Sequence, residues 1–125
     1  MVIHESAEDY LESILVLQQR RGQVRSIDIV NELGYSKPSV SIAMKKLREN
    51  GYILMDGDNL LSLTPAGEAI ADRIYLRHTV LTQMFVALGV SEETARQDAC
   101  KIEHDLSDET FDAIKRHFQA HQETK

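Results

Sequence analysis

Two short helical segments follow one another around a tight turn in the first half of the chain. Residues 26–33 carry apolar side chains at helical spacing and stop before Gly34, and glycine is the residue that most often follows the end of a helix. Residues 36–49 form the second segment, because Pro38 fits the first turn of a helix and Gly51 follows its end. Two helices joined by such a turn form a helix-turn-helix, which strongly limits the folds open to the chain.

A β-hairpin is predicted directly after the second of these helices. Tyr52–Met55 and Leu60–Leu63 are short runs of strand-forming residues, and the segment between them, Asp56–Asn59, consists of turn-forming residues. A hairpin that follows a helix-turn-helix is a wing. Residues 1–63 are therefore predicted to form a winged helix-turn-helix DNA-binding domain.

Helical periodicity fills most of the remaining chain. A first helix runs up to Gly22, a long helix runs from Pro65 to Gly89, and two further helices follow, the first of them reaching about Asp105. The predicted fold is mainly α with a small β-hairpin, and residues 64–125 form a helical dimerisation and metal-binding domain. The expected N-terminal caps of the six helices are Ser6, Ser26, Ser36, Thr64, Ser91 and Ser107.

Charge is distributed unevenly along the chain, whose net charge is −6. This balance argues against a nonspecific nucleic-acid coat, because such proteins are usually basic overall. Residues 36–50 nevertheless hold four basic residues against one acid, whereas residues 92–112 hold eight acids against two bases. The first segment suits phosphate groups and the second suits cations.

The chain has a single cysteine and no long apolar run. No stretch approaches the roughly 18 apolar residues that a membrane helix needs, so no membrane association is predicted and the protein is expected in the cytoplasm. The lone Cys100 excludes an intramolecular disulfide. Its thiol is then a buried apolar group, a reactive group or a metal ligand.

The second helix of the helix-turn-helix begins with side chains suited to the major groove of DNA. Short polar groups there can reach base edges, and the basic side chains around them can contact phosphates. A helix with a merely solvated basic face would show the same local pattern, and the wing that follows favours DNA binding. The residues predicted to contact DNA are Arg25, Ser36, Lys37, Pro38, Ser39, Ser41, Lys45 and Lys46.

A group of possible metal ligands lies near the end of the chain. Cys100, Glu103 and His104 stand at positions i, i+3 and i+4, so a helix would place all three side chains on one face. Thiolate, carboxylate and imidazole together suit a borderline divalent transition metal better than calcium or magnesium. Each residue also has an ordinary structural explanation, as a core thiol, a surface acid and a packed imidazole.

Other possible ligands are scattered through the chain. Asp9 and Glu12 repeat the i, i+3 spacing in the first helix, although the helix dipole favours acids in a first turn whatever their function. His78 lies midway along the long helix, where a lone histidine is more often a packed or surface residue than a ligand. The remaining histidines are interpreted as surface residues near the chain ends, and they are His4, His117 and His121.

Three stretches taken together resemble the diphtheria-toxin-repressor family of metal-dependent regulators, and within it the short branch of manganese transport regulators. They are Glu8–Ile14, Tyr75–His78 and Cys100–Ser107, and they follow one another at that family's intervals. Ser36–Ser41 is similar to the family's recognition helix, and Leu63–Gly67 is similar to its exit from the wing. The resemblance implies that the helices after the wing form a homodimer. It also implies that metal ligands stand at Asp9, Glu12, His78, Glu103 and His104.

Cys100 makes the predicted site a hybrid of two branches of this family. Manganese regulators have a glutamate at this position, whereas the iron-responsive branch has a cysteine. The iron-responsive branch also has a methionine at the position of Asp9, and its further ligand positions match Thr82 and Arg96, neither of which is a suitable replacement. A thiolate gains more with iron(II), cobalt, nickel or zinc than with manganese, so iron(II) is slightly favoured over manganese(II), with the other three as ions bound in vitro.

The predicted function is that of a divalent-metal-dependent transcriptional repressor. The metal-bound homodimer would bind double-stranded operator DNA and control metal-uptake genes, with no organic cofactor. The ion would link the first helix to the dimerisation helices and thereby set the spacing of the two recognition helices.

Two other functions compete with this one. A metalloenzyme would use Glu12 or Glu103 as a base, but the chain has no His-Glu-x-x-His motif, Gly-rich phosphate loop or nucleophile elbow, so no enzymatic activity is predicted. A metal-independent winged-helix regulator that answers an organic ligand is the second alternative.

Overall fold

The structure is a computed structural model that describes residues 5–123. It contains six helices and two strands within that range, and His4 lies outside the described residues. The chain divides into two compact units between Arg73 and Ile74. The elements are α1 (Glu5–Arg21), α2 (Ser26–Leu33), α3 (Lys37–Glu49), β1 (Ile53–Met55), β2 (Leu61–Leu63), α4 (Pro65–Ala87), α5 (Glu92–Ile102) and α6 (Asp108–Glu123).

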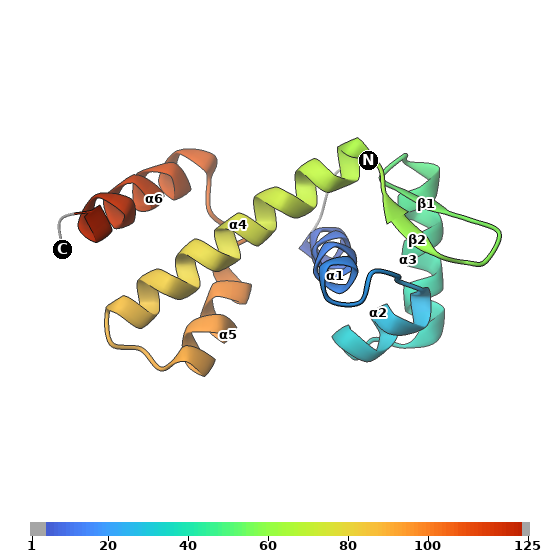
Figure 1. Cartoon of the computed structure of the whole chain (residues 1–125), viewed down its shortest axis with the longest axis horizontal. Helices are drawn as coiled ribbons and strands as arrows, with labels where there is room; N and C mark the ends of the chain where they lie inside the picture. Colours follow the sequence, from blue (N-terminus) through green and yellow to red (C-terminus); the bar gives the residue numbers. More distant parts are fainter. Residues whose placement is uncertain (1–4, 124–125) are drawn as a thin grey trace. The chain divides into compact units, whose positions relative to one another are not determined.

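The first unit is a helix-turn-helix followed by a wing (Figure 1). Strands β1 and β2 pair antiparallel, with Ile53 opposite Leu63 and Met55 opposite Leu61. Its core consists of the apolar faces of α1 and α3 together with Ile29 of α2 and the inward residues of the hairpin. The predicted fold, mainly α with a small hairpin, is confirmed.

Two of the predicted N-terminal caps are wrong, although the predicted range of α2, residues 26–33, is confirmed. Helix α1 begins at Glu5, so Ser6 lies inside the helix and not at its cap. The cap of α2 is Arg25, because the carboxylate of Asp28 accepts a hydrogen bond of 2.9 Å from the Arg25 backbone N–H. The acid three residues further on thus satisfies the backbone N–H of Arg25, which makes Arg25 and not Ser26 the cap.

Thr64 connects the wing to the long helix α4. Its hydroxyl donates to the Gly51 carbonyl at 2.6 Å and accepts a hydrogen bond from the Gly67 N–H at 3.2 Å. The second of these hydrogen bonds is the predicted N-terminal cap of α4. Gly67 is required at this point, because a Cβ atom there would overlap the carbonyl oxygen of Tyr52. The start of α4 is therefore packed directly against the backbone that enters the wing.

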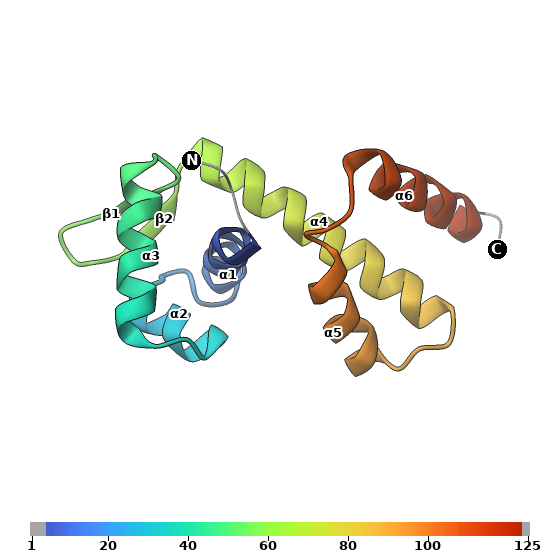
Figure 2. The same cartoon turned by 180° about the vertical axis from the view of Figure 1, so that it is seen from behind.

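The second unit contains α4 from Ile74 onward, together with α5 and α6. Helices α5 and α6 lie on either side of this part of α4 in both views (Figures 1 and 2). Helix α5 ends at Ile102 and not near Asp105 as predicted, and α6 begins after the cap Ser107. A small core joins the three helices, formed by Val80, Leu81, Ala99, Phe111 and Phe118.

Candidate functional site

The second unit brings a histidine, a cysteine and a glutamate together. His78 lies on α4, Cys100 in the last turn of α5, and Glu103 at the residue that caps the end of α5. His78 Nδ1 is 3.0 Å from Glu103 Oε2 and 3.6 Å from Cys100 Sγ. One ligand atom from each of the three residues lies within 4.8 Å of the others, so a single ion can reach all three.

Glu103 is the most buried member of this cluster. Its side chain is 0% exposed, whereas the side chain of His78 is 23% exposed and Cys100 is exposed. A buried carboxylate is costly unless a positive charge and hydrogen bonds compensate it. His78 supplies that compensation in the metal-free chain, because its ring nitrogen bonds to the carboxylate.

The protonation of His78 follows from these contacts. Hydrogen bonds to Cys100 and to Glu103 raise the pKa of His78 from its ordinary 6.5 to about 10, against the opposing effect of its partial burial. The raised pKa favours the protonated ring beside the buried carboxylate. A metal ligand must be neutral imidazole, so His78 would give up this proton if it held an ion here.

His104 lies next to the same carboxylate. Its Nε2 atom is 3.4 Å from Glu103 Oε1, and its side chain is 2% exposed. The carboxylate of Glu103 is therefore placed between two imidazole rings, those of His78 and His104. Cys100, Glu103 and His104 were predicted to share one face of a helix. Only Cys100 lies within α5, because Glu103 and His104 lie just beyond its end.

Arg77 positions this end of α5, and the prediction from sequence missed it. Its guanidinium donates to the carbonyl oxygens of Glu103 at 2.9 Å and Leu106 at 2.6 Å, and to Asp108 Oδ1 at 2.6 Å. It also lies over the ring of Phe111, 5.3 Å from the centroid. The sequence did contain a sign of this role. Arg77 stands at helical spacing from the apolar residues Ile74 and Leu81, which places it on the core face of α4.

The donor set of this cluster fits a borderline divalent transition metal. A thiolate, an imidazole and a carboxylate include two ligand types that calcium and magnesium avoid. The fully buried carboxylate of Glu103 adds a negative charge at the point where a cation would sit. The residues present therefore match the chemistry of a metal site.

Asp9 and Glu12 lie on α1 in the first unit, and both are half-buried. Their participation in the metal site stays a prediction, because the structure describes the two units separately. The predicted domain boundary between residues 63 and 64 also stays a prediction.

Helix α3 presents the predicted DNA-contacting residues to solvent. Lys37, Ser41 and Lys45 are exposed, while Val40, Met44 and Leu47 are buried as expected. Ser36 and Ser39 are partly committed to the helix itself, because Ser36 Oγ donates to Ser39 Oγ at 2.8 Å and accepts the Ser39 N–H at 3.3 Å. Pro38 and Lys46 are also exposed.

Arg25 has a second role that its sequence position did not indicate. Its Nε atom donates to the carbonyl of Asp58 in the wing turn at 3.3 Å. The side chain thus ties the start of α2 to the loop of the wing. Arg25 remains exposed and stays a predicted phosphate contact.

The first unit is a winged-helix DNA-binding fold, and the second unit carries a metal-ligand cluster among its helices. Comparison with known families agrees with both descriptions. Residues 3–59 match the N-terminal DNA-binding domain of iron-dependent repressors, and residues 64–124 match their metal-binding and dimerisation domain.

Individual relatives show the same relationship. The chain is 38% identical over 117 residues to the transcriptional regulator MntR of Salmonella typhimurium, covering 94% of this chain and 74% of the relative. It is 38% identical over 109 residues to the HTH-type transcriptional regulator MntR of Geobacillus kaustophilus, covering 87% and 77%. A solved manganese-dependent transcriptional repressor in complex with manganese superposes with a TM-score of 0.82 at 27% identity, covering 90% of this chain and 52% of that one.

The chain belongs to the iron-dependent repressor family of metal-dependent transcriptional repressors. This confirms the resemblance inferred from sequence and the prediction that the chain is not an enzyme. The chain spans about half the length of the solved repressor described above. Among the helices within residues 5–123, none combines the length and hydropathy needed to cross a lipid bilayer.

Proposed function

We propose that the chain is a metal-gated repressor that acts as a homodimer on double-stranded operator DNA in the cytoplasm and controls metal-uptake genes. The observation that carries this proposal is the cluster of His78, Cys100 and Glu103, whose ligand atoms lie within 4.8 Å of one another. The exposed basic helix α3 supplies the DNA-binding half of the function. A winged helix-turn-helix domain of residues 1–63 and a helical domain of residues 64–125 are the proposed working parts, with no organic cofactor and no membrane partner.

The full ligand set is proposed on sequence grounds. His78, Cys100, Glu103 and His104 come from the second unit, and Asp9 and Glu12 are proposed to complete the site from α1. When bound, the ion supplies a positive charge that compensates the buried carboxylate of Glu103 and replaces the proton on His78. A metal that engages ligands from both parts of the chain in only one arrangement favours that arrangement, and the DNA-competent state is the one proposed to be favoured.

DNA contact is proposed for exposed side chains at the start and along one side of α3. Short polar groups there face base edges, and the lysines contact phosphates. The proposed residues are Arg25, Ser36, Lys37, Pro38, Ser39, Ser41, Lys45 and Lys46. A dimer would present two such helices about one DNA turn apart, so a small reorientation of the two units changes the fit to the operator.

The physiological ion is proposed to be iron(II) or manganese(II), with iron(II) favoured because of Cys100. The thiol lies 3.6 Å from His78 Nδ1, which supports its inclusion in the site. The named solved relative binds manganese, and the comparisons give no support to the iron(II) preference. That preference remains a prediction from ligand softness.

The dimerisation face is proposed to lie at the end of α4. Val86 and Leu88 are 43% and 75% exposed, so two large apolar side chains are left uncovered at and just after the end of α4. They fall within the part of the chain that matches the family's dimerisation domain. A second copy of this chain is therefore the proposed occupant of the face.

Operator binding with and without metal tests the proposed function. A duplex would first be enriched from a random-sequence pool by the manganese-loaded protein, and its Kd would then be measured by fluorescence anisotropy at one fixed salt concentration. We expect manganese(II), or iron(II) under anaerobic conditions, to lower the Kd at least tenfold relative to protein in a chelator. Glu103→Gln should remove this effect, while Glu92→Gln, on the exposed start of α5, should keep it. Equal Kd values with metal and with chelator would refute the proposal.

A further inference from the structure

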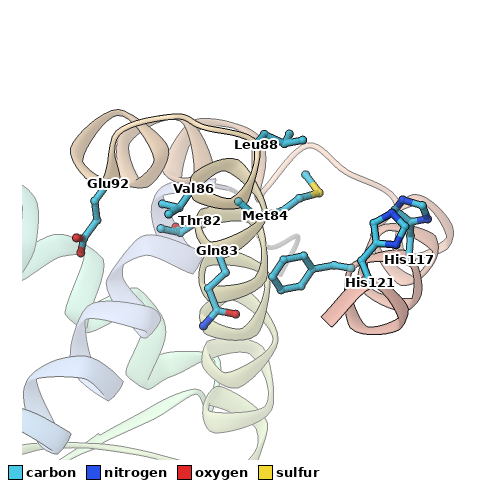
Figure 3. A pocket seen from close by; sticks show the side chains of 10 residues that line it. Thr82, Gln83, Met84, Val86, Leu88, Glu92, His117 and His121 are labelled. Carbon is cyan, nitrogen blue, oxygen red and sulfur yellow. The ribbon is translucent and has the colours of Figure 1, made fainter. Parts of the chain in front are cut away.

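A second pair of metal-ligating side chains lies on α6, outside the cluster described above. His117 and His121 are one helical turn apart and exposed, as the sequence predicted, and their ring centroids are 4.2 Å apart at an interplanar angle of 56°. Figure 3 shows the two imidazole rings side by side on this helix. Both line an open cavity of about 830 Å³ between α6 and the end of α4.

We propose that His117 and His121 form a second transition-metal site, which takes zinc, nickel or copper(II) and not manganese. Residues at i and i+4 of a helix project from the same face, so both rings can direct a nitrogen atom at one ion. Helix α6 already holds them in this arrangement, so little conformational freedom is lost when the ion binds. Both side chains are exposed in the single chain, so the remaining coordination positions are open to water or to a group of the second copy that covers Val86 and Leu88 in the same cavity.

The donor set determines which ions this site accepts. Imidazole suits zinc, copper and nickel, whereas manganese prefers carboxylate, carbonyl and water oxygens. Glu92 is the one carboxylate among the residues that line the cavity, and it lies at the opposite end from the two histidines (Figure 3). The pair therefore offers nitrogen donors alone, unlike the cluster of His78, Cys100 and Glu103.

The two sites would separate ions by chemical class within one chain. The first cluster combines a thiolate with a buried carboxylate and accepts iron(II) or manganese(II) under the proposed function. The pair on α6 has no part in that cluster, because His117 and His121 are not among its ligand atoms. Its occupancy should follow zinc, nickel or copper(II) and leave manganese binding unchanged.

Metal stoichiometry measured on the full chain tests this second site. Isothermal titration of zinc should give one more ion per chain for the natural protein than for the His117→Gln/His121→Gln double variant, and each single substitution should raise the zinc Kd of this site at least tenfold. Manganese stoichiometry should be the same in all of them. Met84→Leu is the matched control, because Met84 lines the same cavity and leucine keeps that wall apolar, so its zinc stoichiometry should equal that of the natural chain.

A spectroscopic measurement identifies the ligands directly. The measurement uses the Cys100→Ser protein, because this substitution removes the thiol that would reduce copper(II). The electron paramagnetic resonance spectrum of bound copper(II) should show coupling to two equivalent nitrogen atoms. This signal should disappear when His117 and His121 are replaced by glutamine. Circular dichroism would verify that the Cys100→Ser protein has the same helical content with and without the two histidine substitutions. The same zinc stoichiometry in the natural chain and the double variant, or a nitrogen signal that survives the double substitution, would overturn the second site.

Discussion

Cys100 is the residue on which the proposed metal preference depends. Its sulfur lies 3.6 Å from His78 Nδ1 in a cluster that otherwise offers nitrogen and oxygen. Replacing it by glutamate keeps a negatively charged ligand but exchanges a soft donor for a hard one. We therefore expect Cys100→Glu to shift the ratio of the iron(II) and manganese(II) dissociation constants at least tenfold toward manganese.

Anaerobic competition titrations of both ions would measure that ratio in the natural chain and in the variant. Asp98→Glu serves as a control, because it changes an exposed acid on the same helix two residues away. Identical iron-to-manganese ratios in the natural chain and Cys100→Glu would show that the thiol does not select the ion.

Glu103 and His78 compensate each other's charge before any metal binds. The carboxylate is fully buried, and the raised pKa of His78, about 10, keeps the imidazolium beside it at neutral pH. This pair stabilises the metal-free fold fully below the ordinary histidine pKa of 6.5 and loses its effect as the pH rises through about 10. The ligand residues thus contribute to the fold as well as to metal binding.

At the scale of elements, Arg77 holds the connection between α5 and α6 against α4. Its guanidinium is 5% exposed and bonds to two backbone carbonyls and Asp108. Lysine has no planar group with several donors, so Arg77→Lys leaves buried carbonyl oxygens without their partner. We expect the free energy of unfolding to fall by about 1.5 to 3 kcal/mol for each charged hydrogen bond lost. Metal affinity should fall as well, because Glu103 is one of the residues held in place.

Urea unfolding of the metal-free protein and manganese titration would measure these two effects. Arg73→Lys is the matched control one turn earlier on α4, where the arginine side chain is 50% exposed and pairs with Glu8 at 3.0 Å. Glu8 is 9% exposed, but lysine at the half-exposed position 73 keeps a positive charge near it, so this control should lose about 1 kcal/mol or less. If both variants lost stability and manganese affinity to the same extent, the positioning role of Arg77 would be wrong.

At the scale of the whole molecule, the proposed homodimer depends on the apolar end of α4. Burying Leu88 in a symmetric interface would contribute about 1.5 to 3 kcal/mol from each copy. Leu88→Glu should therefore raise the dimer dissociation constant about a hundredfold or more. Analytical ultracentrifugation over a range of concentrations would measure this change.

Leu54 provides the control for the dimer experiment. It is 60% exposed but lies on β1 in the wing, outside residues 64–124 that match the dimerisation domain. Leu54→Glu should leave the dimer intact. Two variants that dissociate equally, or a Leu88→Glu protein that stays dimeric, would place the dimer interface elsewhere.

Local sequence signals determined most of the elements of this protein. Gly34 and Gly89 adopt positive φ angles of 73° and 103° where helices were predicted to end, and Thr64, Ser91 and Ser107 cap helices as expected. These features depend on backbone sterics and hydrogen bonds within a few residues, so they can be read without knowledge of the fold. The cap of α2 was misplaced because the carboxylate of Asp28 accepts the backbone N–H of Arg25, and this places the cap one residue before the serine.

The site was only partly readable from sequence. Spacing placed Cys100, Glu103 and His104 together, because they are near neighbours along the chain. The packing of α4 against α5 and α6 decides two further contacts. It places His78 Nδ1 3.0 Å from Glu103 Oε2, and it lets Arg77 donate to the Glu103 carbonyl at the end of α5. Contacts between residues more than twenty positions apart depend on how whole helices pack, and residue spacing carries no information about that. Tertiary structure therefore decided that His78 lies beside the buried carboxylate, while the sequence alone predicted a metal-ligand set at Cys100, Glu103 and His104.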